Sequence, residues 1–204
     1  MRSIPLLLLL CFVASITFAQ TSYHKMGQKA LIDGDFKLAV TNLEKALATD
    51  TTDVNTLYML GYSYYHSGNY NKAVGTFNRV ISFKPGENSA YYYRGKARNI
   101  MANETKGISN PDREKLLLSS IKDFTKAIEL NSEDVKLYQN RAVAYRDYGV
   151  LKGQKIPNSY DKNKAIGAFK LCITDFEKVL SLTPGRKDII TQLADAKSYM
   201  QNLN

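Results

Sequence analysis

The chain has 204 residues, 44% of them hydrophobic and 23% charged, with a formal net charge of +9. This composition is typical of a globular protein long enough to bury a core, as one domain or one short array, and it excludes a low-complexity chain. Beyond the leader described next, Cys172 is the only cysteine, so an intramolecular disulfide is excluded and the core alone must stabilise the fold.

Residues 1–19 have the layout of a secretory signal peptide. Arg2 precedes an apolar run that begins at Ile4, and small residues end at Ala19. The run is about sixteen residues long, shorter than the roughly 20 that a membrane-spanning helix needs. We expect cleavage after Ala19, which makes Gln20 the first residue of an exported protein; an uncleaved anchor is the alternative.

A fixed spacing of 34 residues separates Gly27, Gly61 and Gly95, and other positions keep the same step. We call a set of equivalent positions a column. Past Gly95 the step lengthens, which indicates insertions at 101–113 and 150–166. The repeats are 20–53, 54–87, 88–134 and 135–186, and a half-repeat at 187–204 follows them.

Each repeat is predicted to form two helices. In repeat two, apolar residues recur at steps of three and four on both sides of Gly68, and Pro85 ends the second helix. The half-repeat carries only the first-helix pattern and is interpreted as the capping helix that covers the last apolar face. Cys172 shares a column with Ala39, Ala73 and Ser120, so it is interpreted as a small packing residue.

This pattern resembles the tetratricopeptide repeat family. Repeat two carries the family's residues at the family's spacing, namely Leu57, Leu60, Gly61, Tyr64, Ala73, Phe77 and Pro85. The chain departs from the family in having no tryptophan, Val80 where alanine is usual, and Thr51 and Ser132 in the proline column. The resemblance implies an all-α fold, a right-handed α-solenoid of four helix pairs plus the capping helix. It also implies a concave groove that binds a peptide or partner protein.

Two columns hold opposite charges in repeats three and four: Arg94 with Asp123, and Arg141 with Asp175. Repeats one and two have uncharged residues in both columns. Charges that appear together and are absent together indicate a partly buried ion pair. We therefore interpret these arginines as structural.

The stretch from Gly61 to Val74 carries four tyrosines. Tyr64 and Tyr70 are predicted to pack between helices, whereas the others lie on the stripe that lines the groove in the resembled family. Tyrosine suits such a surface because it offers a large contact area and a polar tip; half-exposed packing is the alternative. The candidate groove residues are Tyr58, Tyr62, Tyr65, Tyr92, Lys96, Asn99, Lys136, Gln139 and Arg146. The lysine–asparagine clamp by which some members bind a C-terminal carboxylate is not supported, because His24, Gln28 and Met59 occupy its places.

No enzyme active site is predicted. The two histidines, His24 and His66, belong to different repeats, and no carboxylate or cysteine stands at ligand or triad spacing from them. There is no phosphate-binding glycine loop. We expect no catalytic residue, no metal and no cofactor.

Both insertions separate the two helices of their repeat, so we expect them at one edge of the solenoid, mostly as loop, with Asp112 or Ser159 as a helix cap. The second is basic, through Lys152, Lys155, Lys162 and Lys164. A basic lip beside the groove would attract an acidic protein segment or an anionic envelope surface. A nucleic-acid partner is not expected for an exported protein.

The sequence therefore predicts an exported protein–protein interaction module, located in the periplasm or cell envelope or secreted. The alternative is a structural subunit that docks into an envelope assembly through its convex face and insertions.

Overall fold

The computed structural model describes residues 22–48, 51–157 and 159–203, and the expected signal peptide and Gln20 lie outside these ranges. The described residues form helices and turns and contain no strand, so the all-α class predicted from the repeat is confirmed. After a helix over residues 22–32, the helices are α2 (Phe36–Leu47), α3 (Val54–His66), α4 (Tyr70–Phe83), α5 (Asn88–Glu104), α6 (Asn110–Leu130), α7 (Val135–Gly153), α8 (Lys162–Leu182) and α9 (Lys187–Gln201).

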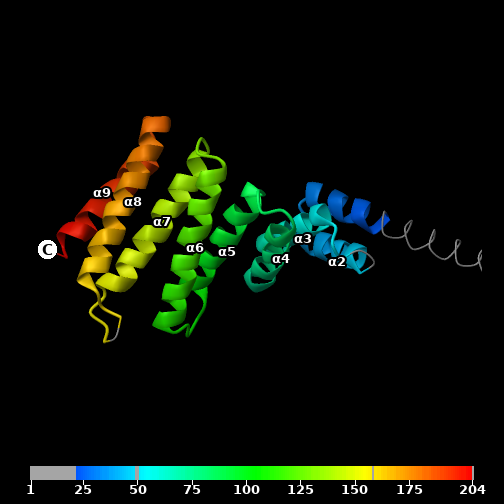
Figure 1. Ribbon diagram of the computed structural model, residues 1–204, viewed down its shortest axis with the longest axis horizontal. Coiled ribbons are helices and arrows are strands. Elements are labelled where there is room, and N and C mark those ends of the chain that lie inside the picture. Colours follow the sequence, from blue (N-terminus) through cyan, green and yellow to red (C-terminus); the bar gives the residue numbers. More distant parts are fainter. Residues whose placement is uncertain (1–21, 49–50, 158, 204) are drawn as a thin grey trace, which may run out of the picture. The chain divides into compact units, whose positions relative to one another are not determined.

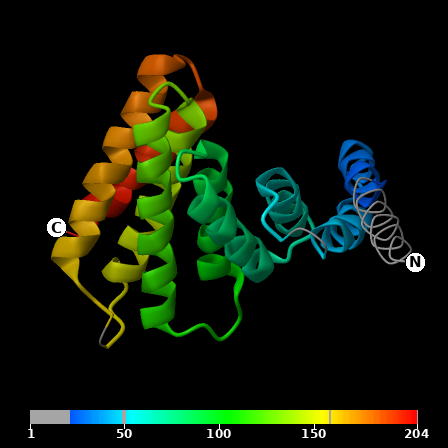
Figure 2. The ribbon, with the colours of Figure 1, turned by 45° about the vertical axis from the view of Figure 1, so that its right-hand side comes forward.

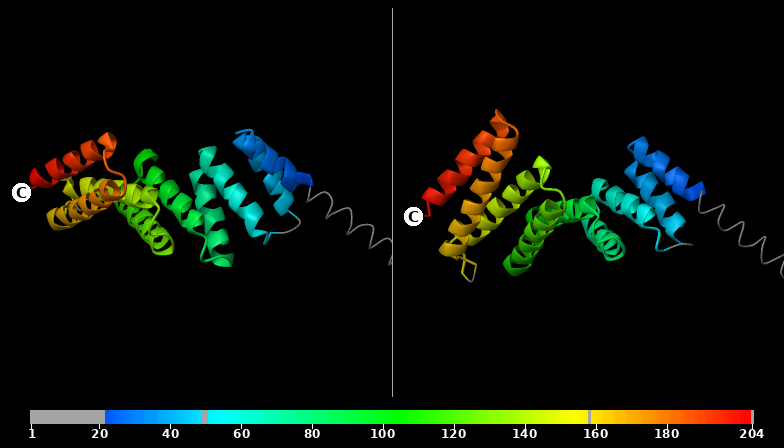
Figure 3. Two further views of the ribbon diagram at one scale, coloured as in Figure 1. Left: turned by 90° about the horizontal axis from the view of Figure 1, so that it is seen from above. Right: turned by 45° about the horizontal axis from the view of Figure 1, so that its top comes forward.

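The chain divides into two compact units. Unit 1 extends to Glu87, and within it α2 packs on α3 and α3 on α4. Unit 2 begins at Asn88, and its five helices lie side by side in chain order (Figure 1). Successive helices run in opposite directions, as α8 and α9 show most clearly (Figure 3). Each unit is thus a stack of antiparallel helices.

Polar caps and glycines set where the helices begin and end. The side chain of Asp35 accepts a hydrogen bond from the backbone N–H of Leu38, and Asp53 does the same at the start of α3. Such caps satisfy N–H groups that have no partner within the helix. Gly34 and Gly68 stand at the turns before α2 and α4 with φ values of 75° and 80°, a conformation that residues with a Cβ rarely adopt.

Aromatic rings pack against small residues where the helices cross. A Cβ atom built on Gly61 would lie 3.0 Å from the ring of Phe77, and one built on Gly95 would lie 3.1 Å from the ring of Phe124. Phe77 and Phe124 are almost fully buried, and a side chain of this size contributes about 1.5–3 kcal/mol on burial. The glycines of the 34-residue column therefore allow the two helices of a repeat to approach closely.

Two clusters of buried side chains form the core of unit 2. The first lies among α5, α6, α7 and α8, and the second among α7, α8 and α9. Cys172 lies in the second, fully buried, and this burial raises the pKa of its thiol to about 12. Its interpretation as a packing residue agrees with this environment.

The insertions differ from the prediction that they are mostly loop. α5 continues to Glu104 and α6 already begins at Asn110, and likewise α7 ends at Gly153 and α8 begins at Lys162. The caps are Ser109 and Asp161, not Asp112 or Ser159. The repeats lengthen mainly because their helices lengthen, and only short segments remain as connections. Both connections lie at the same end of unit 2, as expected (Figures 1 and 2).

Candidate binding surface

A groove with both polar and apolar lining residues lies between α5 and α7 in unit 2. A cavity of about 150 Å³ is lined by Lys96, Asn99 and Ile100 of α5, Phe124 of α6, and Asn140 and Val143 of α7. The Nζ of Lys96 stands 5.5 Å from the centre of the Tyr92 ring one turn earlier, a cation–π contact that limits the movement of both side chains. Of the candidate residues predicted on these two helices, Lys96 and Asn99 therefore line the same cavity.

Next to this cavity, three side chains converge on Asp147. The side-chain amides of Asn99 and Asn103 donate to Oδ2 at 3.2 and 2.8 Å, and Arg146 donates to Oδ1 at 2.9 Å. The Asp147 side chain is only 12% exposed. We call these four residues the Asp147 cluster. Sequence reasoning proposed Arg146 and Asn99 but missed Asp147 and Asn103, because nothing in the repeat marks the contact between α5 and α7.

The remaining unit 2 candidates are less well placed. Tyr92 is half-buried and packs against the first core cluster. Gln139 accepts a hydrogen bond from Arg186, which precedes α9. Lys136 is exposed on α7 and continues the stripe of Asn140 and Val143 at helical spacing.

In unit 1, the division of the tyrosines into buried and groove-facing residues differs from the prediction. Tyr64 is buried, as expected, and its hydroxyl hydrogen-bonds to Glu44 of α2. Tyr58 and Tyr62 are half-buried. Tyr65 was predicted to face the groove, and this is wrong: it is only 9% exposed, because Tyr70 at the start of α4 packs edge-on against it at 5.8 Å.

His66 is the centre of this aromatic group. Its ring stacks on Phe36 at 4.7 Å and lies 4.2 Å from Tyr62 and 5.0 Å from Tyr65. The short turn at Gly68 brings the start of α4 against the end of α3, and Phe36 at the start of α2 packs on the same end. Tyr62 is therefore a half-buried packing residue as much as a candidate contact residue.

The basic insertion also requires a correction. Lys152 is only 5% exposed, and its Nζ lies 3.2 Å from Glu114 Oε2 on α6. The hydroxyl of Tyr148 donates to the other oxygen of the same carboxylate. Lys152 is therefore part of the packing of α6 against α7 and is not exposed on a lip. Lys155 is exposed, Lys162 is half-buried, and Lys164 pairs with Asp161 at 3.4 Å.

The two predicted ion pairs are confirmed. Arg141 donates to both oxygens of Asp175, from Nε and from Nη2, at 2.8 Å each. Arg94 donates from Nε to Asp123 Oδ2 at 3.0 Å. Asp123 and Asp175 are buried. Each pair joins the two helices of one repeat, which is the structural role inferred from the columns.

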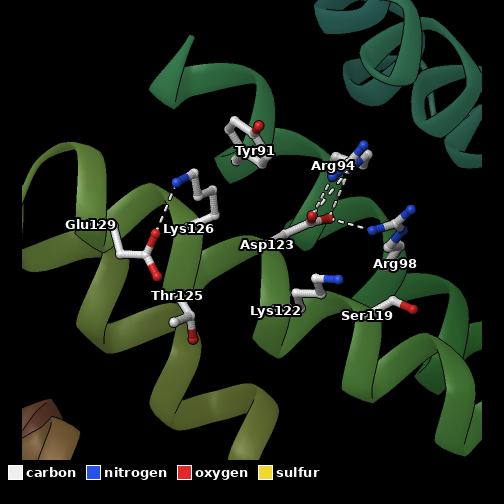
Figure 4. Close-up of a pocket in the computed structure, with 9 residues that line it drawn as sticks. All are labelled: Tyr91, Arg94, Arg98, Ser119, Lys122, Asp123, Thr125, Lys126 and Glu129. Atoms are coloured by element: carbon white, nitrogen blue, oxygen red, sulfur yellow. Dashed lines mark hydrogen bonds and ion pairs between the residues drawn. The ribbon is translucent and has the colours of Figure 1, made fainter. Parts of the chain in front are cut away.

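A second arginine on Asp123 was not predicted. Arg98 donates from Nη1 to Asp123 Oδ2 at 2.6 Å, so two guanidinium groups share one carboxylate (Figure 4). A cavity of about 670 Å³ opens beside them between α5 and α6, and Lys122 and Lys126 also line it. We call it the α5–α6 pocket. The available signal was that Arg98 is the only charged residue in the column of Ala30, Tyr64 and Tyr145.

The fold brings His24 near a carboxylate, which the spacing in the sequence did not indicate. His24 Nδ1 lies 2.6 Å from the hydroxyl oxygen of Thr56 and 3.8 Å from Asp53 Oδ2, because the turn before α3 brings this cap beside the first helix. Within the described ranges, no group of three or more histidine, cysteine, aspartate or glutamate residues is arranged to hold a metal ion. In the same part of the chain, no helix combines the length and the apolar character needed to cross a membrane.

The sequence profile described as tetratricopeptide repeat matches residues 30–98. The fold is a tetratricopeptide-repeat fold. A structure of the MamA protein superposes with a TM-score of 0.67 at 23% identity, over 91% of this chain and 86% of that one. The TPR protein YrrB, described as having an unusual peptide-binding site, superposes with a TM-score of 0.63 at 17% identity, over 85% and 73%.

Among curated proteins, serine/threonine-protein phosphatase 5 of Mus musculus is 25% identical over 125 residues. The match spans 61% of this chain but only 19% of the phosphatase. The similarity therefore concerns about a fifth of that enzyme and not the larger part of it.

Proposed function

We propose that this protein is an exported, non-catalytic interaction module that binds a peptide or a partner protein along the groove between α5 and α7. The observation that carries the proposal is the cavity lined by Lys96, Asn99, Asn140 and Val143 beside the Asp147 cluster. YrrB, which has the same fold, is described as having a peptide-binding site, and this supports the same type of ligand here.

The chemistry of the groove favours an extended segment with its backbone amides accessible. Asn99 and Asn103 are held in position by Asp147, so their orientation costs little conformational entropy when a ligand arrives. Side-chain amides supply both a donor and an acceptor, the two groups that a peptide backbone offers. Lys96, Lys136 and Arg146 outnumber Asp147, so the groove favours a ligand with negative charge.

A matched pair of variants tests the groove. Tagged mature protein is used to capture partners from its native cell envelope, and bound proteins are compared by mass spectrometry. Asn99→Ala with Lys96→Ala should lose a partner that the unmodified protein retains, whereas Lys170→Ala, an exposed change on α8, should retain it. A partner kept equally by all three proteins would favour the alternative, a structural subunit that docks through another face.

Export is proposed from the sequence of residues 1–19. The intact mass of the protein recovered from the cell envelope should correspond to a chain that begins at Gln20, with or without cyclisation of that residue. A mass that includes residues 1–19 would contradict cleavage.

A further inference from the structure

The α5–α6 pocket carries more positive charge than its own ion pairs need. Arg94, Arg98, Lys122 and Lys126 line it together with the two acids Asp123 and Glu129. Lys126 pairs with Glu129 at 2.9 Å, and both arginines bind Asp123. Lys122 is exposed and, within the part of the chain that the structure describes, lies in no ion pair. Among the described residues, Lys122 therefore has no acid paired with it, and Arg94 and Arg98 share the carboxylate of Asp123.

Repeat four shows that the additional arginine is not needed to hold the helices together. There Arg141 and Asp175 form a one-to-one pair, and the residue equivalent to Arg98 is Tyr145. In repeat two the same column holds Tyr64, which is buried. Only repeat three places a cation in this column. Helix pairing therefore gives no account of Arg98.

The environment of Arg98 also favours a further anion. Burial lowers its pKa, the charge of Asp123 opposes this effect, and the charge of Arg94 adds to it. Two guanidinium groups on one carboxylate repel each other, and a second carboxylate would reduce this repulsion. Arginine is suited to such a ligand because its planar donors match the geometry of a carboxylate.

We propose that the α5–α6 pocket binds an aspartate or glutamate side chain of an acidic segment of a partner protein, with Arg98 and Lys122 as the donors. The cavity of about 670 Å³ is far larger than one small anion requires and lies within the usual size range of ligand pockets. Tyr91 supplies an apolar wall for the stem of the side chain and the flanking backbone. In Figure 4, Arg98 lies to the right of the Asp123 carboxylate and Lys122 lies below it.

This site is separate from the proposed groove. Arg94 and Arg98 are one turn apart on α5, whereas Lys96 and Asn99 follow another stripe of the same helix. The inference therefore does not rest on the proposed function, and either can fail alone.

The test uses a fluorescein-labelled peptide, Gly-Glu-Gly-Glu-Gly-Glu-Gly amide, titrated with the protein at low ionic strength and followed by fluorescence anisotropy. A peptide with glutamine in place of glutamate is the ligand control. Arg98→Tyr installs the residue that repeats two and four carry at this position. It should weaken binding of the glutamate peptide by about tenfold, the factor expected for one lost hydrogen bond between charged groups. Lys122→Gln should weaken it by roughly two- to fivefold, as for an exposed ion pair.

Two further variants separate this site from general attraction by a basic protein. Lys170→Gln removes an equivalent exposed charge from α8, and Lys187→Gln removes one from α9; both should leave the affinity unchanged. Equal losses in all four variants would overturn the proposal, as would unchanged binding in Arg98→Tyr and Lys122→Gln. Binding of inorganic phosphate without binding of the peptide would also overturn it, in favour of a small-anion site. Circular dichroism checks that Arg98→Tyr is folded, and if it is not, the exposed Lys122→Gln decides.

Discussion

Asp175 is held at 3% exposure by two hydrogen bonds from Arg141, and a third donor of the same guanidinium reaches Thr125 on α6. Breaking a buried pair is costly, because it leaves a charge without compensation. Arg141→Leu should therefore lower the free energy of unfolding by about 3–5 kcal/mol. The double variant with Asp175→Asn should recover much of this loss in urea unfolding. Additive losses would contradict a direct interaction.

The same variant has a predicted dependence on pH. Burial raises the pKa of Asp175, and Arg141 acts in the opposite direction. Without Arg141 the pKa in the folded state should rise further above the unfolded value, so the folded state binds more protons and its stability falls as the pH increases. The stability difference between wild type and Arg141→Leu should therefore be larger at pH 7 than at pH 5. An equal difference at both values would mean that Asp175 does not titrate in this range.

Two tyrosines that lie three residues apart on α3 provide another comparison of stability. Tyr65 is buried between His66 and Tyr70, whereas Tyr62 is half-buried. Tyr65→Ala should destabilise the protein by about 3–5 kcal/mol, as truncation of a buried aromatic side chain does. Tyr62→Ala should cost about 1 kcal/mol, mainly the edge contacts with Phe36. Thermal unfolding of both variants checks this order, and the reverse order would show that the two rings have exchanged roles.

The contacts that could be predicted from the sequence are those in which both partners change together from one repeat to the next. Arg94 and Arg141 were paired correctly because each charge has its counterpart in a second column. Arg98 was missed because it uses a carboxylate that already had a partner, so no second column changes with it. Lys152 was misassigned for a related reason: its partner Glu114 lies in the preceding repeat, directly after the segment treated as an insertion.

At the scale of elements, two glycines distinguish the effect of packing on stability from the effect of intrinsic helix preference. A Cβ on Gly61 would meet the Phe77 ring at 3.0 Å, whereas one on Gly75, in the middle of α4, would meet nothing within 4 Å. Gly61→Ala should therefore cost about 1–3 kcal/mol by overpacking. Gly75→Ala should stabilise by about 0.5–1 kcal/mol, because alanine loses less backbone freedom in a helix. Chemical denaturation of the two variants should give opposite signs, and a stabilising Gly61→Ala would disprove the close approach of α3 and α4.

The helices themselves were predictable, but the lengths of the inserted ones were not. Apolar spacing identified both helices of every repeat, because each must bury one face. The insertions contain proline and glycine, which indicated loops. Pro111 is instead in the first turn of α6, where a missing N–H costs nothing, and Gly107 with φ 71° makes the turn itself. Proline and glycine therefore located each connection in the sequence, but the helices extend further into it than these residues indicated.

For the whole molecule, the division at Glu87 and Asn88 makes a prediction about independent folding. Both core clusters of unit 2 consist entirely of residues after Asn88, and its helices contact one another in chain order. A fragment of residues 88–204 should therefore be helical by circular dichroism and unfold cooperatively in urea, because both of these clusters are made of its own residues. A fragment without helical signal would show that unit 2 requires the preceding repeats.

The buried thiol of Cys172 provides a way to measure how often the helices around it open. It is the one free cysteine among the described residues, and both its burial and its raised pKa suppress the reactive thiolate. A maleimide can therefore label it only when α8 separates transiently from its neighbours. The labelling rate of the native protein would then report how often the last repeat opens, without an engineered cysteine. Comparing this rate with and without a captured partner would show whether partner binding slows the transient opening of the C-terminal repeat.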